Sequence, residues 1–79
     1  MFKYAITQQE TVRWSMGQVP AAQVTFNNPA LTQFYADLQA NLCTIRLQRH
    51  GPINTGTIRH ELQISYHDPE LELLRRLAV

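Results

Sequence analysis

The 79-residue sequence contains a single cysteine, Cys43, so it cannot form an internal disulfide. This excludes a small secreted domain held by several disulfides and makes the reducing cytoplasm the expected compartment. No stretch approaches the roughly eighteen apolar residues of a membrane-spanning helix. The N-terminal residues also lack the apolar run of a secretory signal. We therefore expect neither secretion nor contact with a membrane.

Charged residues are scarce as well, at 16% of the chain, and the formal net charge is only +1. This balance disfavours a polyelectrolyte tail and a general nucleic-acid clamp, which would be strongly basic. Hydrophobic residues make up 44% of the chain, which suffices for an ordered core. The length predicts one domain over residues 1–79 and leaves little room for an enzyme-sized pocket beside that core.

Three stretches near the N-terminus alternate apolar and polar residues with the two-residue period of a strand. They cover residues 2–6, 12–16 and 22–26. The first two form either one bent strand or two separate strands. The second and third are predicted to form a hairpin that places Trp14 opposite Val24 on an apolar face.

Asn28 and Pro29 predict the start of a helix, because an Asn side chain caps free N–H groups and proline suits the first helical position. An apolar stripe at helical spacing follows, formed by Leu31, Phe34, Tyr35, Leu38 and Leu42. We expect this helix to end near Asn41, which tolerates a left-handed backbone, and a strand over residues 43–50 to follow. The alternative is that the helix continues as far as Arg49.

A second hairpin is predicted to join this strand to another over residues 58–66. The preferred register places Cys43 opposite Ile64 on the inner face. It also places Arg46 opposite Glu61 on the outer face, and this attraction between opposite charges favours the register over its neighbours.

Asp68 and Pro69 predict the start of a last helix in the same way as the first. Acidic residues follow in its first turn and two arginines lie near its end, which suits the helix dipole. Its apolar residues cover more of the circumference than one buried stripe needs. A broad core-facing side explains most of this; the alternative is a homodimer contact through Leu73, Leu77 and Val79.

Residues 24–31 and 64–71 share one pattern at an offset of forty residues: β-branched, hydroxyl, aromatic, polar, cap, Pro, any residue, Leu. The pattern indicates two tandem ββα units, unless any strand that enters a capped helix converges on such residues. The predicted fold is an α+β domain of order ββαββα. Its four-stranded antiparallel sheet carries both helices on one face.

The other face of this sheet is predicted to be polar and free of helices. An antiparallel sheet with one solvated face has this pattern for structural reasons alone. In the functional interpretation, its Arg and Gln side chains bind an acidic protein surface or a phosphate backbone. The residues expected to contact the partner are Lys3, Arg13, Gln23, Arg46, Gln48, Arg59 and Gln63.

Nucleic acid is the weaker of these two partners. Sheets that bind single strands present exposed aromatic rings on which bases stack, whereas the strand aromatics of this chain share the apolar phase. What remains is phosphate contact through the same polar face.

The sequence contains no clear catalytic or metal-binding motif. The contiguous run from Ser65 to Asp68 cannot converge like a catalytic triad, because neighbouring strand side chains point to opposite faces. The spacing of His50, His60 and His67 does not bring three metal ligands together. We predict no catalytic residue, no metal and no cofactor.

The expected function is that of a small non-catalytic binding or regulatory protein in the cytoplasm, an adaptor or inhibitor of a larger protein assembly. Residues 1–7 and 43–50 are predicted to form open sheet edges, which invite strand addition by a target peptide or a second copy of the chain.

Overall fold

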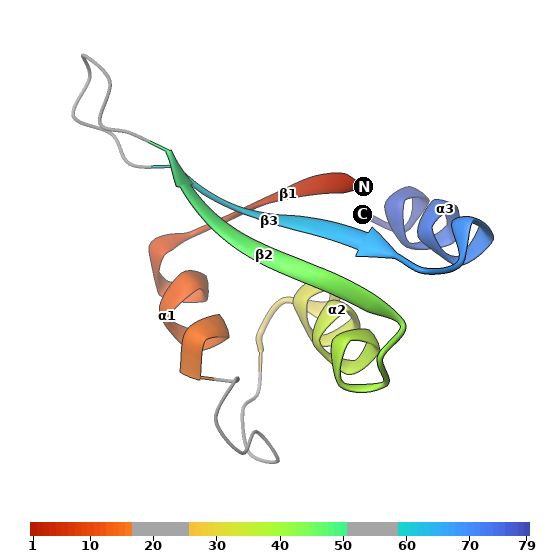
Figure 1. Ribbon diagram of the computed structural model, residues 1–79. Coiled ribbons are helices and arrows are strands. Elements are labelled where there is room, and N and C mark those ends of the chain that lie inside the picture. Colours follow the sequence, from red (N-terminus) through yellow and green to blue (C-terminus); the bar gives the residue numbers. More distant parts are fainter. Residues whose placement is uncertain (17–25, 51–58) are drawn as a thin grey trace.

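The computed structural model describes residues 1–16, 26–50 and 59–79. The elements are, in order, β1 (Phe2–Ile6), α1 (Gln8–Met16), α2 (Pro29–Gln39), β2 (Cys43–His50), β3 (Arg59–Tyr66) and α3 (Pro69–Leu77). The three strands form one antiparallel sheet in the order β1-β3-β2 (Figure 1). The described part of the chain is thus a mixed α+β fold with three helices and a three-stranded sheet.

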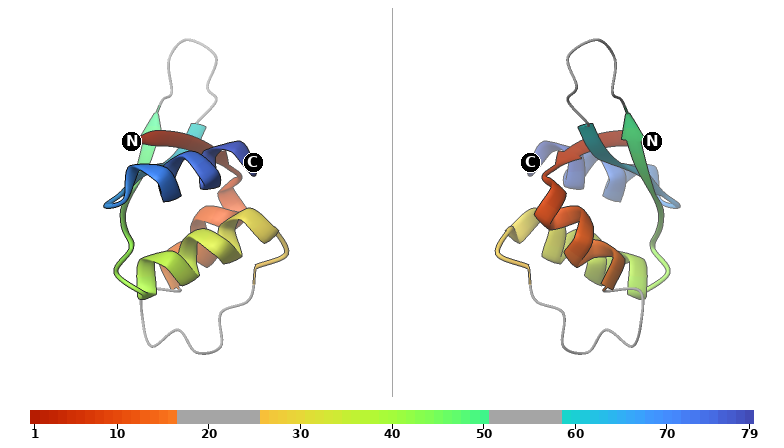
Figure 2. Two further views of the ribbon diagram at one scale, coloured as in Figure 1. Left: turned by 90° about the vertical axis from the view of Figure 1, so that its right-hand side faces the viewer. Right: turned by 90° about the vertical axis from the view of Figure 1, so that its left-hand side faces the viewer.

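α1 and α2 lie on one side of the sheet, below it in Figure 1, and α3 lies beside one end of it. Figure 2 shows this arrangement from two further sides. Trp14 from α1 and Leu31 and Phe34 from α2 share one buried cluster with Leu62 and Ile64 from β3. The core therefore lies between the helices and the apolar face of the sheet.

β3 is the central strand because apolar partners flank it on both sides. On β1, Phe2 lies opposite Ile64 and Tyr4 lies opposite Leu62. Leu62 and Ile64 are completely buried, as expected for inward-facing residues in the middle of a sheet. The first strand consequently pairs with a strand near the C-terminus and not with residues that follow it directly.

The predicted strand over residues 12–16 is wrong, because these residues belong to α1. Thr7 and Glu10 form a reciprocal capping box at the start of this helix. The Glu10 N–H donates to Thr7 Oγ1 at 3.0 Å, and the Thr7 N–H donates to Glu10 Oε1 at 2.8 Å. Trp14 is buried whereas Val12 is exposed, so these two residues do not share a face as the predicted hairpin required.

The partner strand of that hairpin, over residues 22–26, lies outside the described residues except for Phe26. Phe26 belongs to no helix or strand, and it packs against Trp14 and Tyr35 with ring centroids 5.7 and 5.5 Å away. The described chain thus has a helix where the prediction had a second strand.

The predicted helix, turn and strand over residues 28–50 are confirmed. The Asn28 side chain accepts a hydrogen bond from the Ala30 N–H at 2.9 Å, and Pro29 is the first helical residue. Asn41 has a φ of 60°, in the left-handed region that ends helices. The chain then runs directly into β2, which excludes a continuous helix. Leu42 was predicted to belong to the apolar stripe, but it is exposed and lies beyond the end of α2.

β2 and β3 pair as predicted, but two residues away from the predicted register. Cys43 lies opposite Tyr66 instead of Ile64, and Leu47 lies opposite Leu62. This register aligns one more apolar pair than the predicted one, which left Tyr66 without a partner on β2. Because the shift is even, each side chain keeps the predicted face of the sheet.

The start of α3 is also confirmed and matches that of α2. The backbone angles φ and ψ are −102° and 117° at Asp68 and −103° and 114° at Asn28. The likeness of the two halves stops at these caps. Before the cap at Asn28 the described residues form one strand and one helix, whereas two strands lie between α2 and the cap at Asp68. The order ββαββα and the tandem repeat are therefore not matched by the structure.

Candidate functional site

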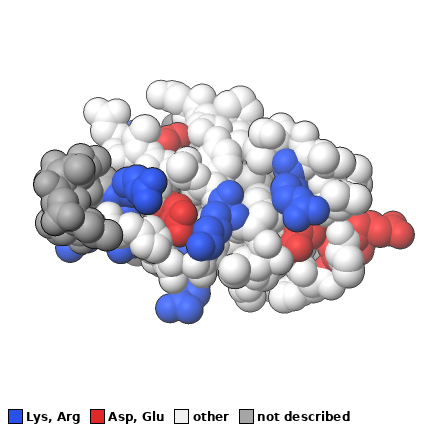
Figure 3. Space-filling model, turned by 90° about the horizontal axis from the view of Figure 1, so that it is seen from above, with Lys and Arg blue, Asp and Glu red and all other residues white. Residues whose placement is uncertain are grey.

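Five of the seven residues predicted to contact a partner share the sheet face that points away from the helices. Lys3 lies on β1, Arg59 and Gln63 on β3, and Arg46 and Gln48 on β2. The register places Lys3, Gln63 and Arg46 in one row across the three strands. Figure 3 looks down on this side of the molecule, where separate basic groups lie among acidic and uncharged ones. We call this surface the polar sheet face.

The other two predicted residues do not join it. Arg13 lies on α1, among the helices, because residues 12–16 are helical and not a strand. Its side chain is exposed, but not on the polar sheet face. Gln23 lies outside the described residues.

Several side chains on the polar sheet face bind one another. The Glu61 carboxylate lies 2.7 Å from Nε2 of His50 and 3.9 Å from Nζ of Lys3. Gln63 Nε2 donates a hydrogen bond to Gln48 Oε1 at 2.7 Å. The predicted pair between Arg46 and Glu61 is absent, because the register brings Gln48 opposite Glu61.

These contacts divide the polar sheet face into a neutralised part and a free part. Lys3 lies beside the Glu61 carboxylate, which also contacts the His50 ring, whereas Arg46 and Arg59 have no acidic partner among the described residues. A hollow of about 240 Å³ lies at the end of the face where β2 and β3 approach residues 51–58. Its lining consists of Lys3, Ala5, His50, Arg59, His60 and Glu61.

β2 is an outer edge of the sheet, with β3 on one side and no described helix beyond the other (Figures 1 and 2). In an antiparallel sheet, alternate residues of an edge strand direct their N–H and C=O groups outward. The charged side chains on β2, Arg46 and Arg49, are both basic, and they lie on opposite faces of the strand because they are three residues apart. The open edge therefore combines free backbone groups with positive charge.

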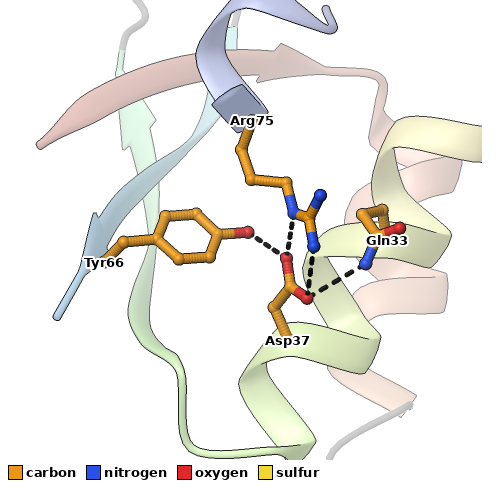
Figure 4. Close-up of polar contacts among 4 residues, drawn as sticks. All are labelled: Gln33, Asp37, Tyr66 and Arg75. Carbon is orange, nitrogen blue, oxygen red and sulfur yellow. Dashed lines mark hydrogen bonds and ion pairs between the residues drawn. The ribbon is translucent and has the colours of Figure 1, made fainter. Parts of the chain in front are cut away.

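A buried polar cluster that the sequence analysis missed joins α2, β3 and α3 (Figure 4). Its centre is the carboxylate of Asp37 on α2, a residue that is only 3% exposed. Arg75 from α3 donates to it through Nε at 2.7 Å and through a terminal nitrogen at 3.3 Å. The Tyr66 hydroxyl donates to the same carboxylate, and Gln33 Nε2 donates at 3.0 Å. The sequence signal was an acidic residue bordering the apolar stripe of a helix.

The pKa values in this cluster indicate a structural role. Burial raises the pKa of Asp37. Hydrogen bonds from Arg75, Tyr66 and Gln33, together with the charge of Arg75, lower it by more, so the pKa lies below its ordinary value of 3.8. Burial and the contact with Asp37 raise the pKa of the Tyr66 hydroxyl. Burial also raises the pKa of the Cys43 thiol to about 11. The carboxylate is thus ionised at neutral pH, whereas hydroxyl and thiol keep their protons and are poor nucleophiles.

The residues of the run from Ser65 to Asp68 make separate structural contacts. Tyr66 binds Asp37, and Asp68 caps α3 by accepting a hydrogen bond from the Glu70 N–H at 3.0 Å. Within residues 1–16, 26–50 and 59–79, no three His, Cys, Asp or Glu side chains form a group that could hold a metal ion.

The three residues predicted for a dimer contact, Leu73, Leu77 and Val79, are all exposed. No helix in the described part of the chain has both the length and the apolar character to span a membrane.

Comparison with known proteins found no matching family model, curated protein or solved structure.

Proposed function

We propose that this protein is a small non-catalytic binding protein whose target is an acidic, extended segment of a larger protein. The segment adds to the open edge of β2, and its carboxylates contact the cations that border this edge. Such binding would suit an adaptor or an inhibitor of a larger assembly.

The observation that carries the proposal is the position of Arg46. It lies in the middle of the edge strand β2, on the polar sheet face, and its side chain is exposed without an acidic partner among the described residues. Arg49 adds a second positive charge to the same strand, on its other face. An added strand would gain main-chain hydrogen bonds from the open edge, and its acidic side chains would gain charge pairing.

The composition of β2 also argues against self-pairing of this edge. An antiparallel pair of two β2 strands would bring arginines close to arginines, because the strand has no acidic residue. Like charges across a strand pair are destabilising. An acidic strand from another protein removes this repulsion.

Binding of a fluorescent peptide with alternating Glu and Val residues tests the proposal. We expect fluorescence anisotropy to show saturable binding, and we expect Arg46→Glu to weaken it by about tenfold or more, as for the loss of a close charge pair. Arg13→Glu is the matched control, because it makes the same charge change on α1, and its affinity should stay near that of the wild type. A peptide with Lys in place of Glu should not bind.

Nucleic acid remains the second candidate, because Arg46 and Arg59 would also suit phosphate groups. A phosphate-binding face would retain single- or double-stranded DNA with an affinity that falls steeply with added salt. Salt-dependent DNA binding that is lost in Arg46→Glu, together with no binding of the acidic peptide, would replace the protein target by nucleic acid.

A further inference from the structure

The two arginines of the edge strand β2 lie on opposite faces of the sheet. Arg46 lies opposite Gln63 on the polar sheet face, whereas Arg49 lies opposite His60 on the face that is covered by α1 and α2. Both arginine side chains are exposed, and neither forms an ion pair with a described residue. A partner that pairs with both charges must therefore reach both faces of this edge.

Two apolar residues of β2 lie on the helix-covered face, directly before and after Arg46 in the chain. Ile45 and Leu47 pack against the core cluster, but both are only partly buried. Their partners on β3, Ile64 and Leu62, are completely buried, whereas no described strand flanks Ile45 and Leu47 on their other side. An added strand would cover the rest of this apolar surface best with apolar side chains of its own.

The side chains of an added strand alternate between the same two faces as those of β2. A side chain beside Arg46 therefore lies on the polar sheet face, and a side chain beside Arg49, three residues further along, lies on the helix-covered face. A strand with acidic residues at every second position places all its carboxylates on one face. Such a strand pairs with Arg46 or with Arg49, but not with both.

We propose that the segment bound by β2 carries two acidic residues three positions apart, one beside Arg46 and one beside Arg49, and apolar residues beside Ile45 and Leu47. This inference rests on the proposed strand addition and names the sequence pattern that the edge selects. Along a parallel segment the pattern is apolar, acidic, apolar, any residue, acidic, and an antiparallel segment has the reverse order. A segment in which acidic and apolar residues simply alternate is bound less tightly, through one arginine alone.

The other polar side chains on β2 are neutral or already have partners within the protein. Gln48 accepts a hydrogen bond from Gln63, and the His50 ring contacts the Glu61 carboxylate. Thr44 is exposed and uncharged. The selection of charge along this edge therefore depends on the two arginines, and their separation of three residues sets the spacing of the acidic residues in the partner.

Two fluorescent peptides of equal composition test this pattern. The matched peptide contains Val-Glu-Val-Val-Glu-Val, which reads the same in both directions and so meets both arginines in a parallel or an antiparallel arrangement. The control peptide contains Val-Glu-Val-Glu-Val-Val, with its glutamates two positions apart. In anisotropy titrations with the wild-type protein, the matched peptide should bind about threefold to fivefold more tightly, as expected for one additional exposed charge pair.

Arg49→Ala should remove the difference between the two peptides, because each of them then pairs with Arg46 alone. Arg49 is exposed, so the fold should be preserved, as checked by the emission of the buried Trp14. Arg13→Ala is the matched control, since Arg13 is exposed on α1, and it should leave the affinity ratio unchanged. If both peptides bind the wild type equally and Arg46→Glu weakens both, strand addition stands and the proposed spacing is wrong.

A charge exchange at Arg49 provides a second test and gives the direction of the added strand. In Arg49→Glu, Val-Glu-Val-Val-Lys-Val pairs opposite charges at both positions if the strand is parallel, and Val-Lys-Val-Val-Glu-Val does so if it is antiparallel. One of these two peptides should bind the variant more tightly than the matched peptide does. If neither does, the pairing at Arg49 is wrong. If neither glutamate peptide binds the wild type saturably, the proposed function falls, and this inference falls with it.

Discussion

Arg75 and Asp37 are separated by 38 residues in the chain, and they form an ion pair with Nε 2.7 Å from Oδ2. The carboxylate is buried, whereas the Arg75 side chain is 26% exposed. The pair fixes α3 against α2, and Tyr66 extends the contact to the central strand. The position of the last helix thus depends on charged groups as well as on apolar packing.

Removal of Arg75 should destabilise the fold. Arg75→Ala leaves the buried carboxylate with only the neutral donors Tyr66 and Gln33. We expect the free energy of unfolding to fall by roughly 2–4 kcal/mol, because an ionised group in the interior loses its charged partner. Urea denaturation followed by Trp14 fluorescence measures this. Arg76→Ala is the control, with an expected change within about 0.5 kcal/mol; equal effects of both substitutions would show that the ion pair adds nothing.

Acid should destabilise the protein through three carboxylates. The N–H groups of Thr7 and Tyr66 lower the pKa of Glu10 and Glu72, respectively, and the donors around Asp37 lower its pKa against the effect of burial. A pKa lowered by folding adds stability that is fully present above the unfolded value and is lost as pH falls through the folded value. The ordinary values are 4.5 for Glu and 3.8 for Asp, so the loss should begin near pH 4.5 and continue below 3.8.

Asp37→Asn provides the matched test of this pH dependence. The variant should be less stable than the wild type at pH 7 but lose less stability on acidification, because one of the three carboxylates is gone. Urea midpoints measured from pH 7 to pH 3 compare the two proteins. Parallel curves would show that Asp37 ionises in the folded protein as it does in the unfolded chain.

The capping box should account for part of the stability of α1. Thr7→Ala removes the hydroxyl that accepts from the Glu10 N–H, and it should cost about 1 kcal/mol. Thr7→Ser keeps the acceptor and should retain most of the stability. If both variants unfold at the same urea concentration, the hydroxyl does not stabilise the helix.

Cys43 should be unreactive in the folded protein. Its side chain is buried, and its pKa of about 11 leaves about a hundredfold less thiolate at pH 8 than the ordinary value of 9.0. Ellman's reagent should label the thiol slowly in buffer and rapidly in urea. Rapid stoichiometric labelling in buffer would show that the start of β2 opens readily.

Local signals predicted the secondary structure from Asn28 onward well. A capping residue before proline fixed the starts of α2 and α3, and the left-handed turn at Asn41 separated α2 from β2. The odd-even phase of β2 and β3 placed Arg46 and Gln63 on the polar face even though the register was wrong. The phase survives because an error of two residues leaves every side chain on the same face.

The part of the chain before Asn28 was harder to predict for two physical reasons. Residues 12–16 alternate as a strand would, but the capping box at Thr7 and Glu10 starts a helix before them. Tertiary packing of Trp14 against Phe26 and Tyr35 stabilises that helix. The pairing of β1 with β3 joins residues about 60 apart, and no local pattern encodes such a contact.

The buried cluster at Asp37 escaped the sequence analysis for a similar reason. Tyr66 and Arg75 are 29 and 38 residues away from Asp37 in the chain. Taken alone, Tyr66 has the pattern of a core aromatic residue, and Arg75 has that of a favourable charge at the end of a helix. Only the folded arrangement of α2, β3 and α3 brings them together.

Amide hydrogen exchange with and without the acidic Glu and Val peptide tests the proposed binding mode most directly. If the peptide adds to the open edge, the outward-facing amides at alternate positions of β2 should become protected, while those of β1 should be unchanged. Arg46→Glu should abolish this protection. Unchanged exchange along β2 at saturating peptide, or protection confined to α3, would contradict binding at this edge.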